Sequence, residues 1–348
     1  MSDSFPPKKH LIGLVGFGTV AKGLCQILSE KRAYLLKELH FDFEIVAVTT
    51  RSRGTMYHPS GLSLSMLLAY AESKTPFTEH LKAWDSETMI RKSNATIIVE
   101  LADSILTTGE PALSHCRAAF ETGKHVVSGN KGPAALAYSE LKTLADQKGC
   151  AFLNEATVLS GTPVFSFIKT ALAGNNILGL RGILNGTTNY ILREMEAGVS
   201  YKLALEKADS QGFLEADKMA DVGGFDAQAK LAILANILFN QALNLDDIKC
   251  KGITELCELD IQTALREGKR WKLVASLTLK KNQILAEVKP EALPFSDPLS
   301  QVSGTLNAIT FSTDLLGDVT LTGPGAGSVE TGYGILSDLL TINTGVFT

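Results

Sequence analysis

The chain has 348 residues, of which 45% are hydrophobic and 20% charged, with a formal net charge of −4. These values are typical of a globular protein, and the length predicts about two domains. The weak net charge gives no reason to expect nucleic acid, and no apolar run reaches the roughly 20 residues that span a bilayer. The start, MSDSFPPKKH, lacks the features of a signal or transit peptide, so we expect a cytoplasmic protein.

Cysteine and histidine usage narrows the possible chemistry. The five cysteines form no CxxC pair, and we expect buried thiols rather than a disulfide framework. All six histidines lie at or before His125. Chemistry in the later part of the chain therefore does not use histidine. This excludes Ser-His-Asp triads, histidine-ligated zinc and histidine-based hydroxy-acid dehydrogenases there.

The segment HLIGLVGFGTVAKGLCQIL (10–28) predicts an apolar strand, a glycine turn and a helix. Gly16 and Gly18, with an alanine three residues later, fit the dinucleotide-binding pattern GxGxxG/A. The glycines allow a tight turn and close approach of a pyrophosphate, and the small third residue lets the helix pack on the strand. The pattern is weak alone, but its place between strand and helix favours a nucleotide site that includes Thr19 and Val20.

Further strands and helices alternate through the first half of the chain. Helical patterns fill the gaps between the strands, and the long connection 54–84 contains an expected helix at 64–72. Alternation of this kind predicts an α/β fold with a doubly wound parallel sheet of the Rossmann type. The expected strands are 43–50, 95–101, 124–130 and 150–155.

The end of the second expected strand carries residues that choose between NAD and NADP. An acidic residue there normally holds the ribose hydroxyls of NAD, but this sequence reads TTRSR (49–53). Arginines at this place can accept a 2′-phosphate, so Arg51 and Arg53 favour NADP, with NAD as the second possibility. The alternative is that both arginines are solvated loop charges.

The pattern changes after about residue 155. A strand at 178–184 leads through a turn into a helix, Ser200 is a candidate cap for the next helix, and a strongly apolar helix is expected at 227–240. Alternating apolar residues then predict an antiparallel or mixed sheet, so this half is expected to be an α+β domain. Its strands are expected at 271–279, 283–288, 307–312 and 318–323, before a final helix at 331–342.

The sequence GFDAQAK (224–230) joins charged residues to the apolar helix. Asp226 and Lys230 are four residues apart and so lie on one helix face. The helix N-terminus disfavours a protonated lysine and carboxylates favour it, and a lysine between these influences suits proton transfer. Glu215 and Asp221 lie just upstream and could bind an ammonium group. The alternative is a solvated acidic loop with a surface ion pair.

At these residues the chain resembles the homoserine dehydrogenase family. The stretch ADSQGFLEADKMADVGGFDAQAK (208–230) is similar to the family's acidic loop and helix-borne lysine. Lys218 departs from this pattern, since the family usually has proline there, and Leu214 stands where a small residue is usual. The resemblance implies a short, monofunctional form without a C-terminal regulatory domain. Other similar segments follow in family order at 126–133, 155–163, 182–192 and 323–327.

The resemblance implies a role for each matching position. Lys230 corresponds to the lysine that donates a proton to the aldehyde oxygen as hydride arrives, and Asp226 and Lys131 are similar to residues that support this step. Lys131 also follows a strand at its carboxyl end, where open parallel sheets place ligands. Glu215 and Asp221 match groups that bind the amino-acid substrate. The loop at the substrate and the nicotinamide matches Gly186 and Thr187.

Two further segments imply ligand contacts through the same resemblance. EATVLSGTP (155–163) is similar to the family's monovalent-cation loop, which is expected to hold sodium in a structural role, although a plain strand-to-helix turn is the alternative. GPGAG (323–327) is expected to bring Gly325 to the cofactor, and a flexible turn is the alternative. The cation ligands would be the backbone oxygens of Glu155, Val158, Ser160 and Thr162.

Taken as a whole, the resemblance implies a Rossmann domain at 1–154, rejoined by 324–348, and a catalytic and dimerisation domain at 155–323. It implies a homodimer that interconverts L-homoserine and L-aspartate 4-semialdehyde with a nicotinamide cofactor, in the pathway to threonine, methionine and isoleucine. The alternatives are another two-domain NAD(P)-dependent amino-acid dehydrogenase and a catalytically silent nucleotide-sensing protein.

Overall fold

The computed structural model describes residues 9–73, 75–214, 217–239, 241–280 and 283–346. The chain divides into two compact units, Met1–Gly161 with Gly327–Thr348 and Thr162–Ala326. The boundaries lie at 161/162 and 326/327, a few residues after the expected 154/155 and 323/324. Residues 155–161 fall in the first unit because they are hydrogen-bonded to its last helix, for example from the backbone N–H of Glu155 to Asp338 Oδ2 at 2.9 Å.

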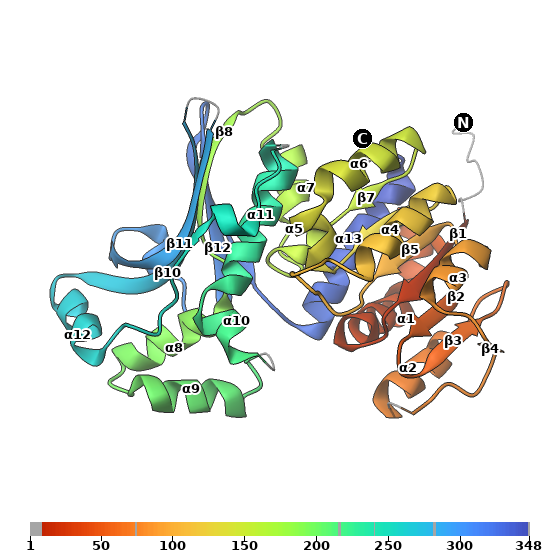
Figure 1. Ribbon diagram of the computed structural model, residues 1–348, viewed down its shortest axis with the longest axis horizontal. Coiled ribbons are helices and arrows are strands. Elements are labelled where there is room, and N and C mark those ends of the chain that lie inside the picture. The colour runs from red at the N-terminus through yellow and green to blue at the C-terminus, as the bar shows by residue number, and fades with distance from the viewer. Residues whose placement is uncertain (1–8, 74, 215–216, 240, 281–282, 347–348) are drawn as a thin grey trace. The chain divides into compact units, whose positions relative to one another are not determined.

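The first unit is built on a seven-stranded sheet with the order β4-β3-β2-β1-β5-β6-β7 (Figure 1). The neighbouring strands β2, β1, β5, β6 and β7 pair in parallel, which confirms the predicted doubly wound sheet. The short edge strands β3 and β4 pair antiparallel and were not predicted. The bounds are β1 Lys9–Val15, β2 Asp42–Thr50, β3 Gly54–Tyr57, β4 Leu81–Lys82, β5 Ile97–Glu100, β6 His125–Ser128 and β7 Phe152–Leu153.

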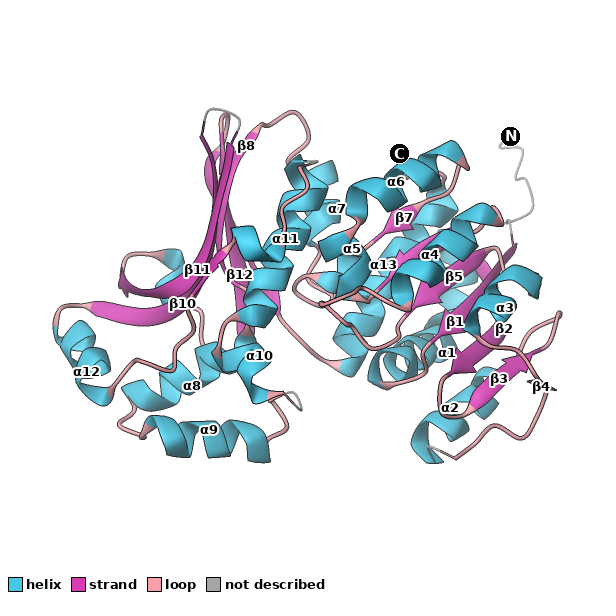
Figure 2. Ribbon diagram, in the orientation of Figure 1, coloured by secondary structure: helices cyan, strands magenta, loops and turns pink. Residues whose placement is uncertain are grey.

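Helices cover both faces of this sheet (Figure 2). Successive side chains of a strand point to opposite faces, so Ile97 and Val99 of β5 join one hydrophobic cluster and Ile98 joins the other. Such strands are apolar on both sides, as expected for parallel strands between two helical layers. The helices are α1 Thr19–Leu39, α2 Leu64–Ser73, α3 Ser86–Lys92, α4 Ala112–Glu121, α5 Lys131–Leu136, α6 Tyr138–Gln147 and α13 Ser328–Thr344.

The last helix, α13, returns to the first unit and packs against α1 at glycines of both helices. A Cβ added to Gly23 would lie 1.9 Å from the backbone oxygen of Ser328, and one added to Gly332 would lie 2.6 Å from the backbone nitrogen of Leu24. Real Cβ atoms do not approach other atoms so closely, so only glycine allows the two helices to come this near. The end of the chain is therefore part of the nucleotide-type unit.

The second unit holds a six-stranded sheet with the order β13-β12-β8-β10-β11-β9. All its pairs are antiparallel except β11 with β9, so the predicted mixed sheet is confirmed. The strands are β8 Ile177–Ile183, β9 Lys249–Cys250, β10 Lys269–Lys280, β11 Gln283–Pro294, β12 Leu306–Thr313 and β13 Gly317–Pro324. The helices are α7 Val164–Thr170, α8 Gly186–Glu196, α9 Tyr201–Ser210, α10 Lys218–Val222, α11 Phe225–Phe239 and α12 Glu258–Arg266.

Helix α11 explains the apolar run of the sequence. Most of its residues from Asp226 to Asn236 are buried, and the helix packs beside β10 and β11. A helix that is apolar on all sides is buried on all sides. None of the helices in the described part of the chain combines the length and apolar character needed to cross a bilayer.

The cysteines correct one prediction. Cys25, Cys116 and Cys150 are buried free thiols, as expected, but Cys250 is half-buried and Cys257 is exposed. Cys257 precedes α12 as its N-cap residue, where the chain enters the helix from the surface. Burial raises the pKa of the Cys25 thiol to about 12.

Candidate active site

The glycine turn after β1 has the geometry of a dinucleotide cradle. Gly16 has a φ of +93°, and a Cβ there would lie 2.4 Å from the backbone oxygen of Leu101. Gly18 is the N-cap of α1, and no described atom lies within 4 Å of a Cβ built on it. No side chain of the described residues caps this helix, so its first N–H groups, which include those of Thr19 and Val20, lie at an open N-terminus. The turn thus fits a bound pyrophosphate.

The structure distinguishes the two arginines that follow β2. Arg53 donates hydrogen bonds to the backbone oxygens of Phe17 and, at 3.1 Å, of Tyr70. Its guanidinium lies 5.3 Å and 5.2 Å from the ring centres of Phe17 and Phe77, and desolvation lowers the pKa of Arg53. Arg53 therefore supports the glycine turn, while Arg51 is exposed in the turn after β2.

Lys131 is the first residue of α5, directly after the carboxyl end of β6. Its backbone N–H donates to Ser104 Oγ at 3.0 Å, and the preceding Asn130 caps the helix by accepting from Gly132 N at 2.9 Å. Asn130 Nδ2 also donates to the backbone oxygen of Ala102 at 2.9 Å. The β6–α5 turn is thereby joined to the turn after β5, at the same edge of the sheet as the glycine turn.

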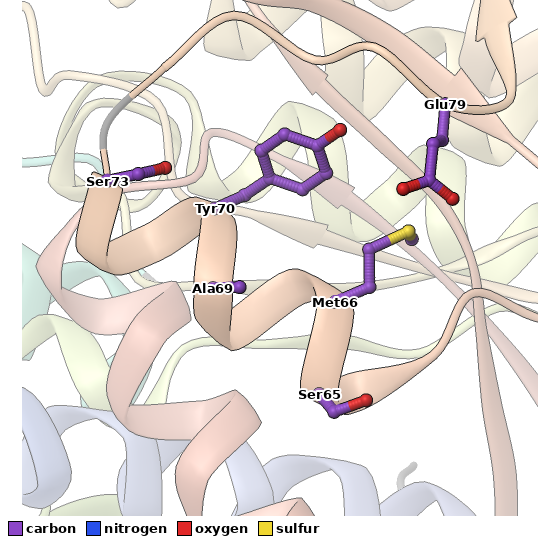
Figure 3. A pocket seen from close by; sticks show the side chains of 6 residues that line it. All are labelled: Ser65, Met66, Ala69, Tyr70, Ser73 and Glu79. Carbon is purple, nitrogen blue, oxygen red and sulfur yellow. The ribbon is translucent and has the colours of Figure 1, made fainter.

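One pocket of about 470 Å³ in the first unit lies between α2 and the segment that follows it (Figure 3). The side chains of Met66 and Tyr70 project from α2 toward the segment that carries Glu79 (Figure 3). None of the residues predicted for the site lines this pocket, which is formed by Ser65, Met66, Ala69, Tyr70, Ser73 and Glu79.

In the second unit, Lys230 and Asp226 form a buried ion pair on the first turns of α11. Lys230 Nζ lies 2.7 Å from Asp226 Oδ2 and donates a second hydrogen bond, also 2.7 Å long, to the backbone oxygen of Leu184. The two residues are 8% and 6% exposed, so the alternative of a solvated surface pair is wrong. The helical spacing of four residues predicted this contact.

Asn185 is a central residue that sequence reasoning missed. Its side-chain nitrogen donates to Asp221 Oδ1 at 2.7 Å and to Asp226 Oδ2 at 3.0 Å, and its oxygen accepts from Thr188 N at 2.8 Å. One amide therefore connects both carboxylates and caps α8. An asparagine directly before a helix is a preferred N-cap, and this was the signal available in the sequence.

The two residues that follow Asn185 both lie against backbone of other segments. A Cβ on Gly186 would lie 2.5 Å from the backbone oxygen of Thr305, so this contact requires glycine. The hydroxyl of Thr187 donates to the backbone oxygen of Phe213 at 2.7 Å. The start of α8 is thus fixed to the chain just before Glu215, which itself lies outside the described residues.

The structure places Lys218, the departure from the family pattern, on the surface. It is the first residue of α10, follows the N-cap Asp217, and forms a 2.6 Å ion pair with Asp209. The first helical position is one that proline favours, which accounts for the family's usual residue, and exposure accounts for the tolerated charge. Leu214 is half-buried in the loop before α10, and nothing in the structure explains it.

The expected cation loop has an unusual backbone. Leu159 and Ser160 have φ angles of 55° and 58°, which are uncommon for residues other than glycine. Glu155, Val158 and Ser160 are buried in the first unit, while Thr162 begins the second unit. Within the described part of the chain, no group of three or more histidine, cysteine or acidic side chains could hold a metal ion, so any cation here would rely on backbone oxygens.

Gly325 faces a buried amide. A Cβ there would lie 2.0 Å from Asn307 Oδ1, and Asn307 is 0% exposed. Neither polar atom of the Asn307 side chain has a hydrogen-bond partner among the described residues. Within the second unit, glycine is therefore required at 325 because Asn307 occupies the space of a side chain.

A doubly wound sheet with an open glycine turn, combined with a unit that buries a lysine–carboxylate pair, defines a two-domain NAD(P)-dependent oxidoreductase. A family model for homoserine dehydrogenase matches residues 163–340, and a model for the NAD-binding domain of homoserine dehydrogenase matches residues 16–155. The chain belongs to the homoserine dehydrogenase family. It is an enzyme of amino-acid biosynthesis that acts on a CH–OH group with a nicotinamide cofactor.

Individual relatives agree with this assignment. The NAD(+)-dependent homoserine dehydrogenase of Pseudomonas canavaninivorans is 42% identical over 340 residues, which cover 96% of each chain. A crystal structure of a homoserine dehydrogenase from Thiobacillus denitrificans matches 97% of this chain and 73% of its own with a TM-score of 0.84 and 30% identity. The structure of a hyperthermophilic archaeal homoserine dehydrogenase in complex with NADPH matches 97% of this chain and 98% of its own, with a TM-score of 0.83 and 28% identity.

Proposed function

We propose that Lys230 is the proton donor in the interconversion of L-homoserine and L-aspartate 4-semialdehyde. The observation that carries this role is the 2.7 Å contact between Lys230 Nζ and Asp226 Oδ2 in a buried site. The carboxylate favours the ammonium form of the lysine, which can protonate the aldehyde oxygen during reduction. In the oxidative direction the neutral amine accepts the proton of the hydroxyl.

The charges of this cluster suit an amino-acid substrate. Asp221 and Asp226 carry two negative charges, Lys230 carries one positive charge, and Asn185, which connects the carboxylates, is neutral. The net negative charge attracts the ammonium group of the substrate, and low solvent exposure strengthens this attraction. We assign this ammonium group to Asp221 together with Glu215, and we assign Gly186 and Thr187 to the substrate loop.

The nicotinamide cofactor, when bound, accepts or supplies the hydride. We assign Gly16, Gly18, Thr19, Val20 and Gly325 to its binding. Lys131 starts α5 at the carboxyl edge of the parallel sheet, where its cationic side chain can assist cofactor and substrate. Arg53 holds the glycine turn through the backbone oxygen of Phe17.

We propose NADP as the preferred cofactor and NAD as an accepted one. The turn after β2 contains no acidic residue between 49 and 53, and Arg51 is exposed there, which favours a 2′-phosphate. The NAD(+)-dependent relative at 42% identity favours NAD. Kinetics of wild type and Arg51→Ala with both cofactors decide between them. We expect Arg51→Ala to lower kcat/KM with NADP and to leave kcat/KM with NAD unchanged, and equal effects would refute the phosphate contact.

The main test is oxidation of homoserine by the purified enzyme at alkaline pH, followed through NAD(P)H formation. Lys230→Ala is expected to lower turnover by at least about a hundredfold, the lower scale of general acid catalysis. Cofactor affinity should remain. Lys218→Ala is the matched control, because this lysine is exposed and paired only at the surface with Asp209. Unchanged turnover in Lys230→Ala would reject the assigned role.

Three further properties belong to this proposal. We propose a homodimer formed through the second unit, where Leu285, Leu315 and Leu316 are more than half exposed. Sedimentation measures this oligomeric state. The expected location is the cytoplasm.

We also propose a structural sodium ion at the loop 155–162, supported by the uncommon backbone at Leu159 and Ser160. Thermal unfolding in sodium compared with a large organic cation tests for this ion.

A further inference from the structure

A buried histidine–carboxyl contact lies at the carboxyl end of β5, outside the residues assigned so far. Glu100 is the last residue of β5 and is 0% exposed, and His115 lies on α4 and is 5% exposed. His115 Nδ1 and Glu100 Oε2 are 2.7 Å apart. The other carboxylate oxygen, Oε1, accepts from the backbone N–H of Ala102 at 2.8 Å. Both oxygens of Glu100 are therefore engaged, one with the histidine and one with the following turn.

That turn, residues 101–104, touches the glycine turn of the nucleotide cradle. The backbone N–H of Leu101 donates to the backbone oxygen of Val15 at 2.7 Å. A Cβ on Gly16 would lie 2.4 Å from the backbone oxygen of Leu101 and 2.8 Å from the backbone nitrogen of Ala102. A small displacement of the turn would therefore meet the backbone of Gly16.

The same turn also joins the start of α5. Asn130 Nδ2 donates to the backbone oxygens of Ala102 and Asp103, at 2.9 Å and 3.2 Å. Ser104 Oγ accepts from the backbone N–H of Lys131 at 3.0 Å. The turn thus connects the glycine turn on β1 with the β6–α5 turn that carries Lys131. All these contacts lie within the first unit.

The contact between Glu100 and His115 lies at the edge of the sheet where ligands of such folds bind. Strands β1 and β5 are neighbours, and β2 lies on the other side of β1. The order in which strands are added to the parallel sheet therefore reverses at the β1–β5 crevice. Open parallel sheets bind their ligands outside the carboxyl ends of the strands at such a reversal. A buried carboxyl group needs hydrogen-bond partners, and here His115 and the N–H of Ala102 supply them, so the contact fixes the turn that follows β5.

We propose that Glu100 and His115 are positioning residues for the cofactor. Glu100 holds the N–H of Ala102, and His115 holds Glu100. The turn 101–104 is thereby fixed against Gly16 on one side and against Asn130 and Lys131 on the other. The ligand is the nicotinamide dinucleotide, so the inference rests on the oxidoreductase assignment but not on homoserine as substrate.

The test uses two pairs of variants of the full chain. Glu100→Ala and His115→Leu remove the contacts. Glu100→Gln keeps an acceptor for Ala102 N, and its amide N–H can donate to Nδ1 of the neutral His115 tautomer that carries its proton on Nε2. His115→Asn keeps a polar group near the position of Nδ1. The dissociation constant of NADPH is measured by its fluorescence without substrate, and KM for cofactor and for homoserine are measured separately.

We expect Glu100→Ala and His115→Leu to raise the NADPH dissociation constant by about tenfold to a hundredfold, the upper end being the scale that an ångström-sized misplacement can cost a site. KM for homoserine should change by less than about twofold, because these residues act on the cofactor edge. The conservative variants should recover most of the affinity. A wild type that binds NADPH but does not oxidise homoserine would contradict the proposed substrate without affecting this inference.

The control for a general loss of stability is Ile90→Ala. Ile90 is fully buried on α3 in the same unit and belongs to a hydrophobic cluster that includes Ile98. It should lower the melting temperature and leave NADPH affinity unchanged. An equal loss of affinity in Ile90→Ala, or unchanged affinity in folded Glu100→Ala, would overturn the proposal. If the buried variants do not fold, Ser104→Ala provides the test at the exposed end of the turn, with a smaller loss of affinity expected and unchanged affinity contradicting it.

Discussion

Two regions of the second unit bury a lysine in contrasting ways. At the start of α11, Lys230 donates to the carboxylate of Asp226 and to the backbone oxygen of Leu184. Between β10 and α8, the partners of Lys272 among the described residues are neutral: Asn189 Oδ1 at 2.7 Å and the backbone oxygen of Val302 at 2.5 Å. Burial lowers the pKa of Lys272 to about 8.

The difference shows what a counter-charge does for a buried ammonium group. A carboxylate favours the charged lysine, so the group at α11 suits proton transfer. Neutral oxygens accept two hydrogen bonds from Lys272 but do not offset the cost of removing its charge from water. The role of Lys272 is structural, since Asn189, its partner, also donates to the backbone oxygens of Val302 and Gly304 and so ties α8 to the segment before β12.

The largest expected effect is a loss of turnover when the ion pair on α11 is removed. Asp226→Asn removes the counter-charge of Lys230 and leaves a neutral amide beside Asn185. We expect turnover to fall by at least about tenfold to a hundredfold, because the proton donor loses the group that favours its charged form. Steady-state kinetics with homoserine measure this effect. Wild-type turnover in the variant would mean that Asp226 does not support the lysine.

Removal of the other buried lysine, Lys272, should lower stability but leave turnover nearly unchanged. Lys272→Met keeps the length of the side chain but removes the hydrogen bonds to Asn189 and Val302. We expect a loss of about 1–3 kcal/mol in the free energy of unfolding, because the buried Asn189 Oδ1 loses its donor and Val302 O keeps the longer bond from Asn189 Nδ2. Turnover should stay within about threefold of wild type. Urea unfolding and homoserine kinetics measure the two quantities, and a collapse of turnover at unchanged stability would place Lys272 in the catalytic machinery instead.

The pKa of Lys272 also predicts a pH effect. Its pKa is about 8 in the folded protein and 10.5 ordinarily, so between these values the unfolded chain binds more protons. The unfolding free energy therefore rises with pH in this window through this group, by on the order of 1–2 kcal/mol between pH 8 and 9.5, and the contribution is lost as pH falls through 8.

Lys272→Met should remove this part of the rise when its urea unfolding is compared with that of wild type at both pH values. Lys124 of the first unit, which donates to the backbone oxygen of Ser93 and whose pKa burial also lowers to about 8, should keep its own contribution. An identical pH dependence in wild type and Lys272→Met would contradict the assignment.

The smallest effect is expected at Lys218. Lys218→Pro restores the usual family residue at the first position of α10 and removes an exposed ion pair with Asp209. The gain from proline and the loss of the pair are each below about 1 kcal/mol, so stability should change by less than about 0.5 kcal/mol. Thermal unfolding and turnover are the measurements. A large loss of turnover would show that this position shapes the substrate loop.

Several features of the fold were predictable because local physics determines them. The period of apolar residues predicted the parallel strands and α11, and the glycine spacing predicted the turn at Gly16. Ser200 was predicted as a cap and accepts from the backbone N–H of Leu203 at 3.4 Å. The edge strands β3 and β4 were missed because two to four residues carry too little pattern to predict a strand.

The sequence by itself determined that Asp226 and Lys230 meet, since the α-helix places residues four apart on one face. Only the tertiary structure decided that this pair is buried, that Asn185 connects it to Asp221, and that Arg53 rather than Arg51 supports the glycine turn. These outcomes depend on contacts between segments far apart in the chain. Their partners are chosen by packing of the whole unit, and no local period or spacing records that choice.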